Sequence, residues 1–449
     1  MNKINSQLVF TFGCLLSLSS THLQSSEFIV KDVDSNKSTN TTWIALPYLF
    51  SSDATGVTAG VIGIFNGFIQ PQMNMFITAY IGERLPVENI DSSGKHENKE
   101  ANSKGFAFGI NGYKPSLSKR VFISAFGNLA YYPNQRIYLE GSNDSIRNVE
   151  EIGIKNYTPF QTQGFNNWAR VDFRYVLPIG EGKSDVIPTI LLKRGIAVNR
   201  DAYGNNTPFL SGQTVLGLEL FYTKFTADKL THEPSLNSNG VRLYLEHDNT
   251  DYPDNPSRGY NFKLKSSFDF GLSNSSQSWN SLEASYSHYF ELPNFSWSRQ
   301  NVIALNSWSA YSPSWDATQK AENSFLDKNQ PPMWEGARLG GYTRMRAYDQ
   351  NRFSDKAAIY FAAEYRLILG LNPLEKQKWA PVSIDWFQTV LFAEAGRVAP
   401  KYDVKELMSD MKYDVGVSLR ALTAKVPMRL EIAYGAEGVN MWVMIKQPF

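Results

Sequence analysis

Histidines and their neighbours are the first residues to examine for chemistry, because metal sites and acid–base sites place histidine at set spacings or beside a carboxylate. No two histidines lie at a metal-ligand spacing, and no Gly-x-Ser-x-Gly turn presents a serine nucleophile. His247 precedes Asp248, as in acid–base pairs and in structural turns, and the lack of a nucleophile favours a turn. The five histidines are His22, His96, His232, His247 and His288. The sequence therefore predicts no enzyme, no metal site and no bound cofactor.

Charge and aromatic content narrow the class of protein. Lysine and arginine number 44 and aspartate and glutamate 43, the net charge is +1, and the basic residues are spread along the chain. A nucleic-acid partner is not expected, because binding to phosphates needs a basic patch. Aromatic residues make up 14% of the chain. Transmembrane β-barrels place such rings at both bilayer interfaces, although a carbohydrate-binding β-protein would show the same excess.

The first 26 residues have the pattern of an export signal. Lys3 is followed by an apolar run, residues 8–18, and by several serines that suit cleavage. The only cysteine, Cys14, lies within this signal, so the mature chain would form no disulfide. Residues 27–41 are expected to be a short polar segment in the periplasm. Beyond them no run of about 18 apolar residues could cross a bilayer as a helix.

The rest of the chain, residues 42–449, alternates apolar and polar residues in segments of roughly 9 to 14 residues. In one such segment Tyr413 and Val415 share one face, whereas Asp414 and Arg420 share the other. A period of two is typical of β-strands with one apolar and one polar face. A soluble β-sandwich would show it too, but the number and length of the segments favour a barrel in a membrane.

The expected fold is all-β: a transmembrane antiparallel β-barrel of about 16 strands, with one long loop folded into its lumen. Residues 42–163 hold about four to six of these strands. The others are expected near 166–179, 185–199, 211–226, 238–249, 258–273, 279–292, 298–311, 355–369, 384–396, 412–423, 427–436 and 439–449. The connection between 311 and 355 has some 40 residues, and ordered loops of this length are usually functional.

Several short segments follow one another in an order and spacing that resembles a known family. They are 248–259, an acidic turn ending in Pro-x-x-Gly; 339–342, with Gly340 and Gly341; 345–348, with Met345, Arg346, Ala347 and Tyr348; 361–366; and 391–396. Together they resemble the bacterial surface antigen superfamily, the BamA/TamA-like outer-membrane assembly factors and their two-partner-secretion relatives. Phe449 stands where the assembly signal of that family ends. The likeness is clearest from about residue 238 to the end.

Two positions depart from the family pattern, since Ala347 replaces a glycine and Glu394 an aspartate. Glycine would let the loop tip turn tightly, so the alanine bears on the geometry of the loop. The family also has periplasmic domains that receive substrates, and residues 27–41 leave no room for them.

The charges at the loop tip are expected to form an ion-pair latch. Glu364 and Glu394 fall on the lumenal faces of adjacent predicted strands, and Arg346 could fold in and bridge them with charge-assisted hydrogen bonds. The alternative is that all three are ordinary solvated charges in a wet lumen. Residue pattern alone favours that alternative, whereas the family resemblance favours the latch.

Three functions fit these predictions. The resemblance implies an outer-membrane protein of a Gram-negative bacterium that helps to insert or translocate other proteins. Its partners would be outer-membrane lipid, unfolded outer-membrane protein clients and periplasmic chaperones, and the barrel would act as a monomer. The alternatives are a passive, porin-like channel for small solutes and a surface protein with a structural or adhesive role.

Overall fold

Strands make up almost all of the ordered structure. A computed structural model of the chain describes residues 27–33, 42–52, 54–90, 96–138, 160–200, 209–228, 235–321, 326–374, 384–423 and 425–449. Sixteen strands form one antiparallel sheet, the wall, in which each strand pairs with the next. They are β2 (Thr42–Ser52), β3 (Gly56–Asn66), β4 (Asn74–Ile90), β5 (His96–Tyr113), β6 (Val121–Ile137), β7 (Phe160–Val176), β10 (Gln213–Thr226), β11 (Ser235–Asp248), β12 (Gly259–Phe270), β13 (Ser278–Leu292), β14 (Ser298–Tyr311), β19 (Ala357–Leu369), β20 (Ile384–Ala399), β21 (Lys412–Thr423), β22 (Val426–Gly435) and β23 (Gly438–Ile445).

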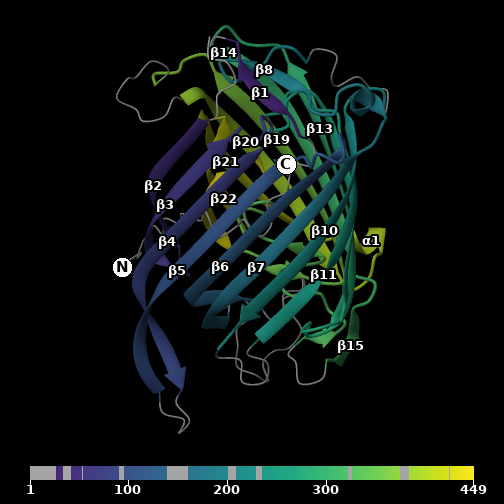
Figure 1. Cartoon of the computed structure of the whole chain (residues 1–449). Coiled ribbons are helices and arrows are strands. Elements are labelled where there is room, and N and C mark those ends of the chain that lie inside the picture. The colour runs from purple at the N-terminus through teal and green to yellow at the C-terminus, as the bar shows by residue number, and fades with distance from the viewer. Residues whose placement is uncertain are drawn as a thin grey trace.

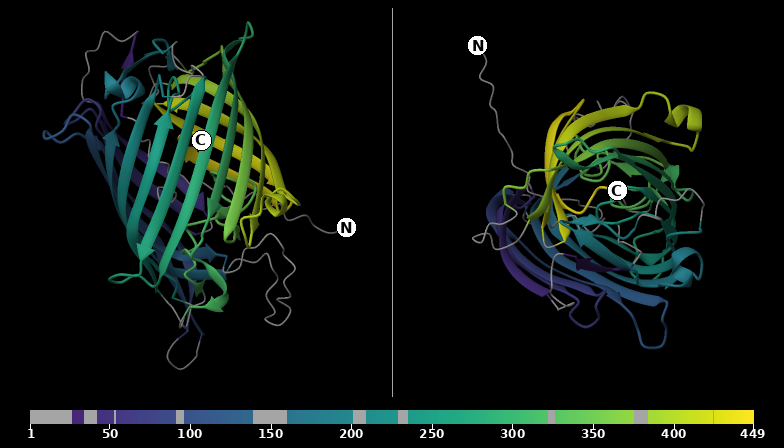
Figure 2. Two further views of the ribbon diagram at one scale, coloured as in Figure 1. Left: turned by 90° about the vertical axis from the view of Figure 1, so that its right-hand side faces the viewer. Right: turned by 90° about the horizontal axis from the view of Figure 1, so that it is seen from above.

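The wall curls around a lumen (Figures 1 and 2). This confirms the all-β fold and the number of strands predicted from the sequence. The two edges of the sheet are β2 and β23, and no pairing joins them within the described ranges. We call the end at which the chain enters β2 and leaves β23 the terminal end, which is the upper end in Figure 1, and the opposite end the loop end.

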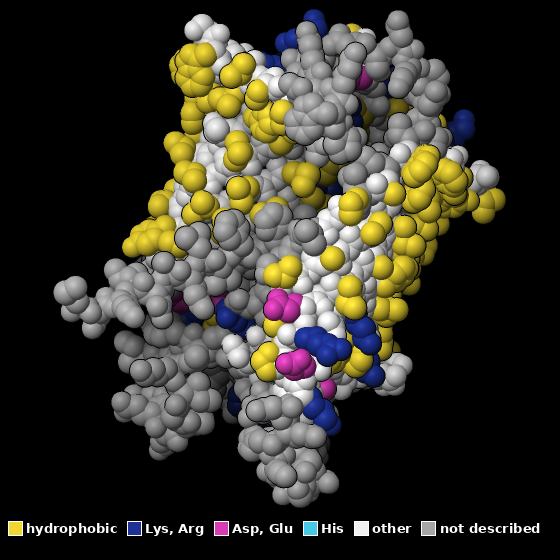
Figure 3. Space-filling model, turned by 90° about the vertical axis from the view of Figure 1, so that its left-hand side faces the viewer, with side chains coloured by type: hydrophobic (Ala, Val, Ile, Leu, Met, Phe, Trp, Pro, Cys, Tyr) yellow, Lys and Arg dark blue, Asp and Glu magenta, His cyan; other side chains and the backbone are white. Residues whose placement is uncertain are grey.

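The two faces of the wall differ as the alternation predicts. Along β21 the side chains of Val415 and Val417 are about half exposed, at 53% and 50%, whereas Asp414 and Arg420 are buried. Figure 3 shows hydrophobic side chains over much of the outer surface, with charged side chains gathered toward the loop end. The outer surface is therefore apolar where lipid would contact it, and the lumen is polar.

The lengths of the strands vary around the wall. Strands β4 to β7 have 17 or 18 residues each. Near the two edges of the sheet the strands are shorter: β2 and β3 have 11 residues, β22 has 10 and β23 has 8. Only short helices occur in the described part of the chain, and none of them is long or apolar enough to cross a membrane.

One predicted wall strand, near 185–199, lies outside the wall. The chain between β7 and β10 forms η1 (Gly180–Lys183), β8 (Thr189–Lys193) and β9 (Ile196–Ala197). Arg194 and Gly195 both have positive φ, 50° and 75°, so the chain turns back after five residues of β8 and cannot continue as a wall strand. Residues 177–200 instead fold over the terminal end, where β8 is visible at the top of Figure 1.

A segment that precedes the wall in sequence packs onto residues 177–200. Residues 27–33 contain β1 (Ile29–Asp32), which pairs in parallel with β8. We call residues 27–33 and 177–200 together the terminal cap. The predicted export signal, residues 1–26, and residues 34–41 lie outside the described residues.

Candidate functional site

The long loop leaves the wall after β14, folds into the lumen and returns at β19. Its short strands pair in two hairpins: β15 (Asp316–Lys320) with β16 (Asp327–Lys328), and β17 (Arg338–Leu339) with β18 (Phe353–Ser354). Met345 and Tyr348 of the loop belong to one buried apolar cluster with Phe392 of the wall. The loop therefore packs against the inner face of the wall and occupies the lumen.

Two glycines shape the loop before its tip. Gly340 and Gly341 have φ values of 106° and 111°, which side-chain-bearing residues rarely adopt. A Cβ atom on Gly340 would lie 2.3 Å from the carbonyl oxygen of Asp349, and one on Gly341 would lie 2.1 Å from Gln350 Oε1. The pair lets the chain fold back closely on itself and carries residues 345–348 to the wall.

Arg346 lies at the centre of the buried tip, and its side chain is fully buried. Its guanidinium contacts three carboxylates from three strands of the wall: Glu364 on β19 at 2.8 Å, Glu394 on β20 at 3.0 Å and Glu431 on β22 at 2.8 Å. It also stacks on the ring of Phe392, 3.5 Å from the centroid. The structure thus brings Arg346, Glu364 and Glu394 together and adds a third carboxylate.

Backbone groups of the tip are bound as well. The Arg346 amide donates to Glu394 Oε2 at 2.6 Å, and the Ala347 amide donates to Asp414 Oδ2 at 3.1 Å. On the last strand, Trp442 Nε1 donates to the Arg346 carbonyl at 2.7 Å. Strands β20, β21 and β23 therefore hold the backbone of the tip by hydrogen bonds, in addition to the ion pairs of the Arg346 side chain.

Further arginines surround the same carboxylates. Arg420 lies 2.9 Å from Glu364 and 3.2 Å from Glu431. Arg366 lies 2.8 Å from Glu364, and Arg429 pairs with Glu431. We call Arg346, Glu364, Glu394, Glu431, Arg366, Arg420 and Arg429 the lumenal network. Buried charges of this kind add little net stability, but they strongly disfavour an arrangement that leaves one of them unpaired.

The predicted latch did not include Glu431, Arg420, Arg429 or Asp414, although the alternation had placed Asp414 and Arg420 on the polar face of their strand. A signal for them existed, because the alternation that turns Glu364 inward also turns every second residue of β21 and β22 inward. That alternation gives the face of a side chain, but not how far along the lumen the loop tip will lie.

Ala347, which replaces the family glycine, does not have a positive φ; the left-handed residue at the tip is Met345, with φ 56°. The Cβ atom of Ala347 faces Gly435 on β22. A Cβ atom added to Gly435 would lie 2.9 Å from the Cβ of Ala347 and 3.2 Å from the ring of Tyr348. The methyl group of Ala347 therefore occupies space that a glycine on the wall leaves free. The tip is buried in the lumen with alanine at this position.

The last residues of the chain depart from the predicted strand 439–449. β23 ends at Ile445, because Lys446 has φ 64°, although the Lys446 amide still donates to the Pro427 carbonyl at 2.7 Å. Phe449 then packs against buried residues of the inner face of the wall. Its carbonyl oxygen accepts a hydrogen bond from Arg366 at 3.2 Å, and the Arg366 guanidinium lies 5.1 Å from its ring centroid. Phe449 is thus directed into the lumen instead of extending the last strand.

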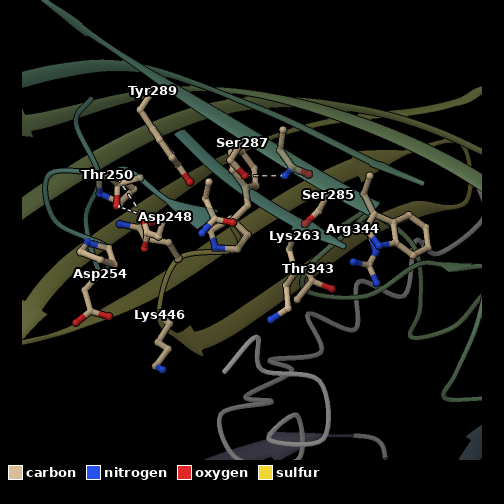
Figure 4. A pocket seen from close by; sticks show the side chains of 18 of the residues that line it. Asp248, Thr250, Asp254, Lys263, Ser285, Ser287, Tyr289, Thr343, Arg344 and Lys446 are labelled. Carbon is tan, nitrogen blue, oxygen red and sulfur yellow. Dashed lines mark hydrogen bonds between the residues drawn. The ribbon is translucent and has the colours of Figure 1, made fainter. Parts of the chain in front are cut away.

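A cavity of about 150 Å³ lies between the loop, the wall and these last residues. Figure 4 shows Arg344 and Thr343 of the loop at one end and Asp254 and Lys446 at the other. The Arg344 guanidinium stacks on Trp308, 3.9 Å from the ring centroid. Most residues that line the cavity carry polar or charged side chains, but apolar atoms make up more of its surface. None of the described residues forms a cluster of three or more histidine, cysteine or acidic side chains suited to a metal ion.

Comparison with known proteins agrees with the architecture. The sequence matches the Omp85 superfamily domain over residues 190–440. The structure resembles CdiB from Escherichia coli with a TM-score of 0.52 and 11% identity, covering 89% of this chain and 61% of that one. BamA from Haemophilus ducreyi lacking POTRA domains 1-3 is matched with a TM-score of 0.42 and 12% identity over 91% and 69%, and CdiB from Acinetobacter baumannii with 0.46 and 11% over 89% and 56%.

The chain thus spans less than two thirds of the length of either CdiB protein. No curated protein sequence matches it. The likeness to CdiB from Escherichia coli, at 11% identity, shows the fold alone, whereas the match to the family domain covers more than half of the chain. The chain belongs to the Omp85 superfamily.

Proposed function

We propose that this protein is an outer-membrane barrel that helps to insert or translocate other proteins, and that it has no catalytic role. Its partners would be membrane lipid, unfolded outer-membrane protein clients and the periplasmic chaperones that deliver them. Membership of the Omp85 superfamily supports the location in the outer membrane of a Gram-negative bacterium. The apolar outer surface supports it independently, because only a lipid-facing wall needs exposed rows of valine and leucine.

The seam between β2 and β23 is the observation that carries the proposal. These strands are the two edges of the sheet, and within the described residues neither pairs with the other. An edge strand presents unpaired amide and carbonyl groups that can template an incoming strand. Because β23 ends at Ile445 and the chain then turns into the lumen, its last four residues do not extend that edge. A client strand could therefore pair with the edge of the wall.

We further propose that the lumenal network acts as a latch on the loop. Arg346 connects the loop to β19, β20 and β22, and Trp442 on β23 bonds to the Arg346 carbonyl. The strands that the tip contacts include β23, which borders the seam. The loop would thus keep the lumen filled and hold the last strands in register while the seam opens.

An insertion assay with purified protein tests the proposal. The full chain is reconstituted into lipid vesicles, and the folding rate of a small, urea-denatured outer-membrane barrel is measured by its heat-dependent shift on gels. We expect folding at least several-fold faster than in vesicles that hold an equal amount of an unrelated 16-stranded barrel. Equal rates in both preparations would contradict the proposal. Steady ion conductance without faster folding would instead favour the passive channel.

A further inference from the structure

The terminal cap contains a segment that is bound much as a peptide ligand is bound. Residues 27–33 run along β8, with Ile29 opposite Thr189 and Asp32 opposite Leu192. The Ile29 amide donates to the Pro188 carbonyl at 2.9 Å, and further along the segment the Val33 amide donates to the Leu192 carbonyl at 2.8 Å. The segment adds a third strand to the small β8–β9 sheet, which is the pairing mode by which many proteins bind extended peptides.

Side chains of the segment fit separate receiving positions. Glu27, only 2% exposed, forms an ion pair with Arg174 at 2.7 Å on the lumenal side of β7. Gly112 leaves the space that it needs, because a Cβ there would lie 2.3 Å from Glu27 Oε2. At the other end Asp32 lies 3.1 Å from Lys425 in the turn between β21 and β22.

Between these two charges the contacts are apolar. Phe28 meets Tyr252 edge-on, with 6.1 Å between ring centroids. Phe28 and Val30 both pack against a buried cluster formed by Ile190, Leu192 and Tyr252. The receiving surface therefore contacts four side chains in a set order: the acidic Glu27, the aromatic Phe28, the aliphatic Val30 and the acidic Asp32.

The charged receiving groups have other partners that remain if the segment leaves. Arg174 also bonds to Asp172 at 3.1 Å and to Asn111 at 3.1 Å. Lys425 also lies 2.8 Å from Asp385. Removing residues 27–33 thus leaves neither cation without a counter-ion, so the empty site would not carry the large cost of an unpaired buried charge.

The β8–β9 hairpin is likewise held without the segment. Trp386 Nε1 donates to the Gly195 carbonyl at 3.0 Å, and Arg299 Nη2 donates to the Arg194 carbonyl at 2.8 Å. Asn199 bridges the hairpin by accepting from the Leu191 amide and donating to the Thr189 carbonyl, both at 2.8 Å. The groove is therefore preorganised, which lowers the cost of binding an extended chain.

We propose that the groove along β8 is a binding site for an extended segment of another polypeptide, and that residues 27–33 are a tethered ligand that occupies it until such a segment displaces them. The inference rests on the proposed function for the source of the partner, an unfolded client that arrives at the terminal end. It adds a receiving site on the cap that is distinct from the seam, and it defines the sequence pattern that the site accepts.

A peptide-binding measurement on the full chain in detergent micelles tests the site. The probe is a fluorescent peptide with the sequence of residues 27–33, blocked at both ends, and binding is followed by anisotropy. In the parent protein the tethered segment competes at an effective concentration in the millimolar range, so micromolar peptide should bind poorly. Val30→Asp puts a charge into the apolar cluster and should release the segment. We expect peptide affinity to rise at least tenfold.

Matched controls show whether the peptide binds at the groove along β8. A peptide of the same composition in scrambled order should not bind. Lys425→Ala, combined with Val30→Asp, should weaken the parent peptide several-fold but leave a peptide with Asp32→Asn unchanged, because both changes remove the same contact. Trypsin cleavage after Lys31 reports release of the segment, and a heat-dependent shift on gels reports an intact barrel. If Val30→Asp does not fold, Asp32→Lys loosens the segment by repulsion from Lys425 without touching the apolar cluster.

Release of the segment without peptide binding, or equal binding of the scrambled peptide, would overturn the proposal and leave residues 27–33 as a structural part of the cap. The insertion assay is read separately. A chain that binds the peptide but does not accelerate client folding would contradict the proposed function and leave the peptide site supported. A chain that accelerates client folding but does not bind the peptide would contradict the peptide site alone.

Discussion

The two ends of the lumen are filled in different ways. At the loop end the tip is held mainly by buried charges, with Arg346 in contact with three carboxylates. At the terminal end the cap is held by strand pairing, an apolar cluster and Trp386, together with the ion pair of Glu27 with Arg174, which keeps Asp172 as a second partner. Loss of a member of the charged network is costly where it leaves another buried charge without its partner, as loss of Arg346 would do for Glu394. Loss of one strand hydrogen bond or one apolar contact costs less free energy than loss of a buried counter-ion. The cap is therefore better suited to exchange residues 27–33 for another segment, and the loop is better suited to stay in one position.

The largest effect is expected for Arg346→Ala. Glu394 would lose its only arginine partner among the described residues, while Glu364 and Glu431 would keep Arg420. The loss should cost on the order of 3 to 5 kcal/mol locally, and the loop should leave the lumen. We expect faster proteolysis between residues 312 and 351 and a larger or noisier conductance, with the barrel still formed.

Arg346→Lys is the matched control. An ammonium keeps the charge but cannot engage several carboxylates with the planar fork of a guanidinium, so we expect only partial recovery of protease resistance. If Arg346→Ala matched the parent in both proteolysis and conductance, the network would not hold the loop, and the contrast between the two ends would fail.

A smaller effect is expected at the cap for Trp386→Ala. The Trp386 side chain is fully buried, packs in one cluster with Ile368 and Leu422, and bonds to the Gly195 carbonyl. Its loss should cost about 3 kcal/mol and free the hairpin, seen as trypsin cleavage after Arg194. Trp386→Phe removes the hydrogen bond and part of the ring but keeps most of the packing, so it should cost less, on the order of 1 to 2 kcal/mol. Unchanged cleavage in Trp386→Ala would show that other contacts hold the hairpin.

The fit between Ala347 and Gly435 allows a finer test of the loop. Gly435→Ala would bring two Cβ atoms to 2.9 Å and should loosen the tip by about 1 to 2 kcal/mol. Ala347→Gly in the same chain removes one of the two methyl groups and should restore most of the protease resistance. Two losses that simply add, measured as a double-mutant cycle, would mean that the two residues do not share this space.

The smallest expected effect is a pH dependence of the cap. Burial raises the pKa of Glu181 in η1 from its ordinary 4.5 to about 7, with Asp185 adding to the rise and Arg200 opposing it. Because the folded cap binds this proton more tightly than the unfolded chain, the stabilisation is present at low pH and is lost as pH rises through about 7. Proteolysis of residues 180–200 should therefore be faster at pH 8.5 than at pH 5.5. Glu181→Gln should abolish the difference.

Much of the wall could be predicted from the sequence, because lipid outside and polar groups inside impose a period of two on every strand. The same period led to a wrong prediction of a wall strand at 185–199, because alternation does not indicate which sheet a strand will join. That segment is held over the terminal end by bonds such as those from Trp386 to Gly195 and from Arg299 to Arg194, which join residues more than 100 positions apart. Long-range contacts of this kind leave no local pattern.

The charged residues of the lumen were only partly predictable. Alternation placed Glu364 and Glu394 on the lumenal face, and the family resemblance supplied Arg346. To predict Glu431 as a partner of Arg346, one must know how far into the lumen the loop tip reaches. That distance follows from the three-dimensional path of a loop with two positive-φ glycines. The inward turn of Phe449 depends on a positive φ at Lys446, and nothing in the sequence predicts that conformation for a lysine.

The unequal strand lengths have a consequence for the surrounding bilayer. A strand of eight residues such as β23, tilted by about 45°, rises about 19 Å along the barrel axis, whereas the apolar band of such barrels is about 25 Å tall. Lipid chains beside β23 must shorten or splay to cover it, while those beside the 17-residue and 18-residue strands need not. In an outer membrane this hydrophobic mismatch would thin the bilayer at the seam, and a new strand inserted there would enter the bilayer where it is most deformed.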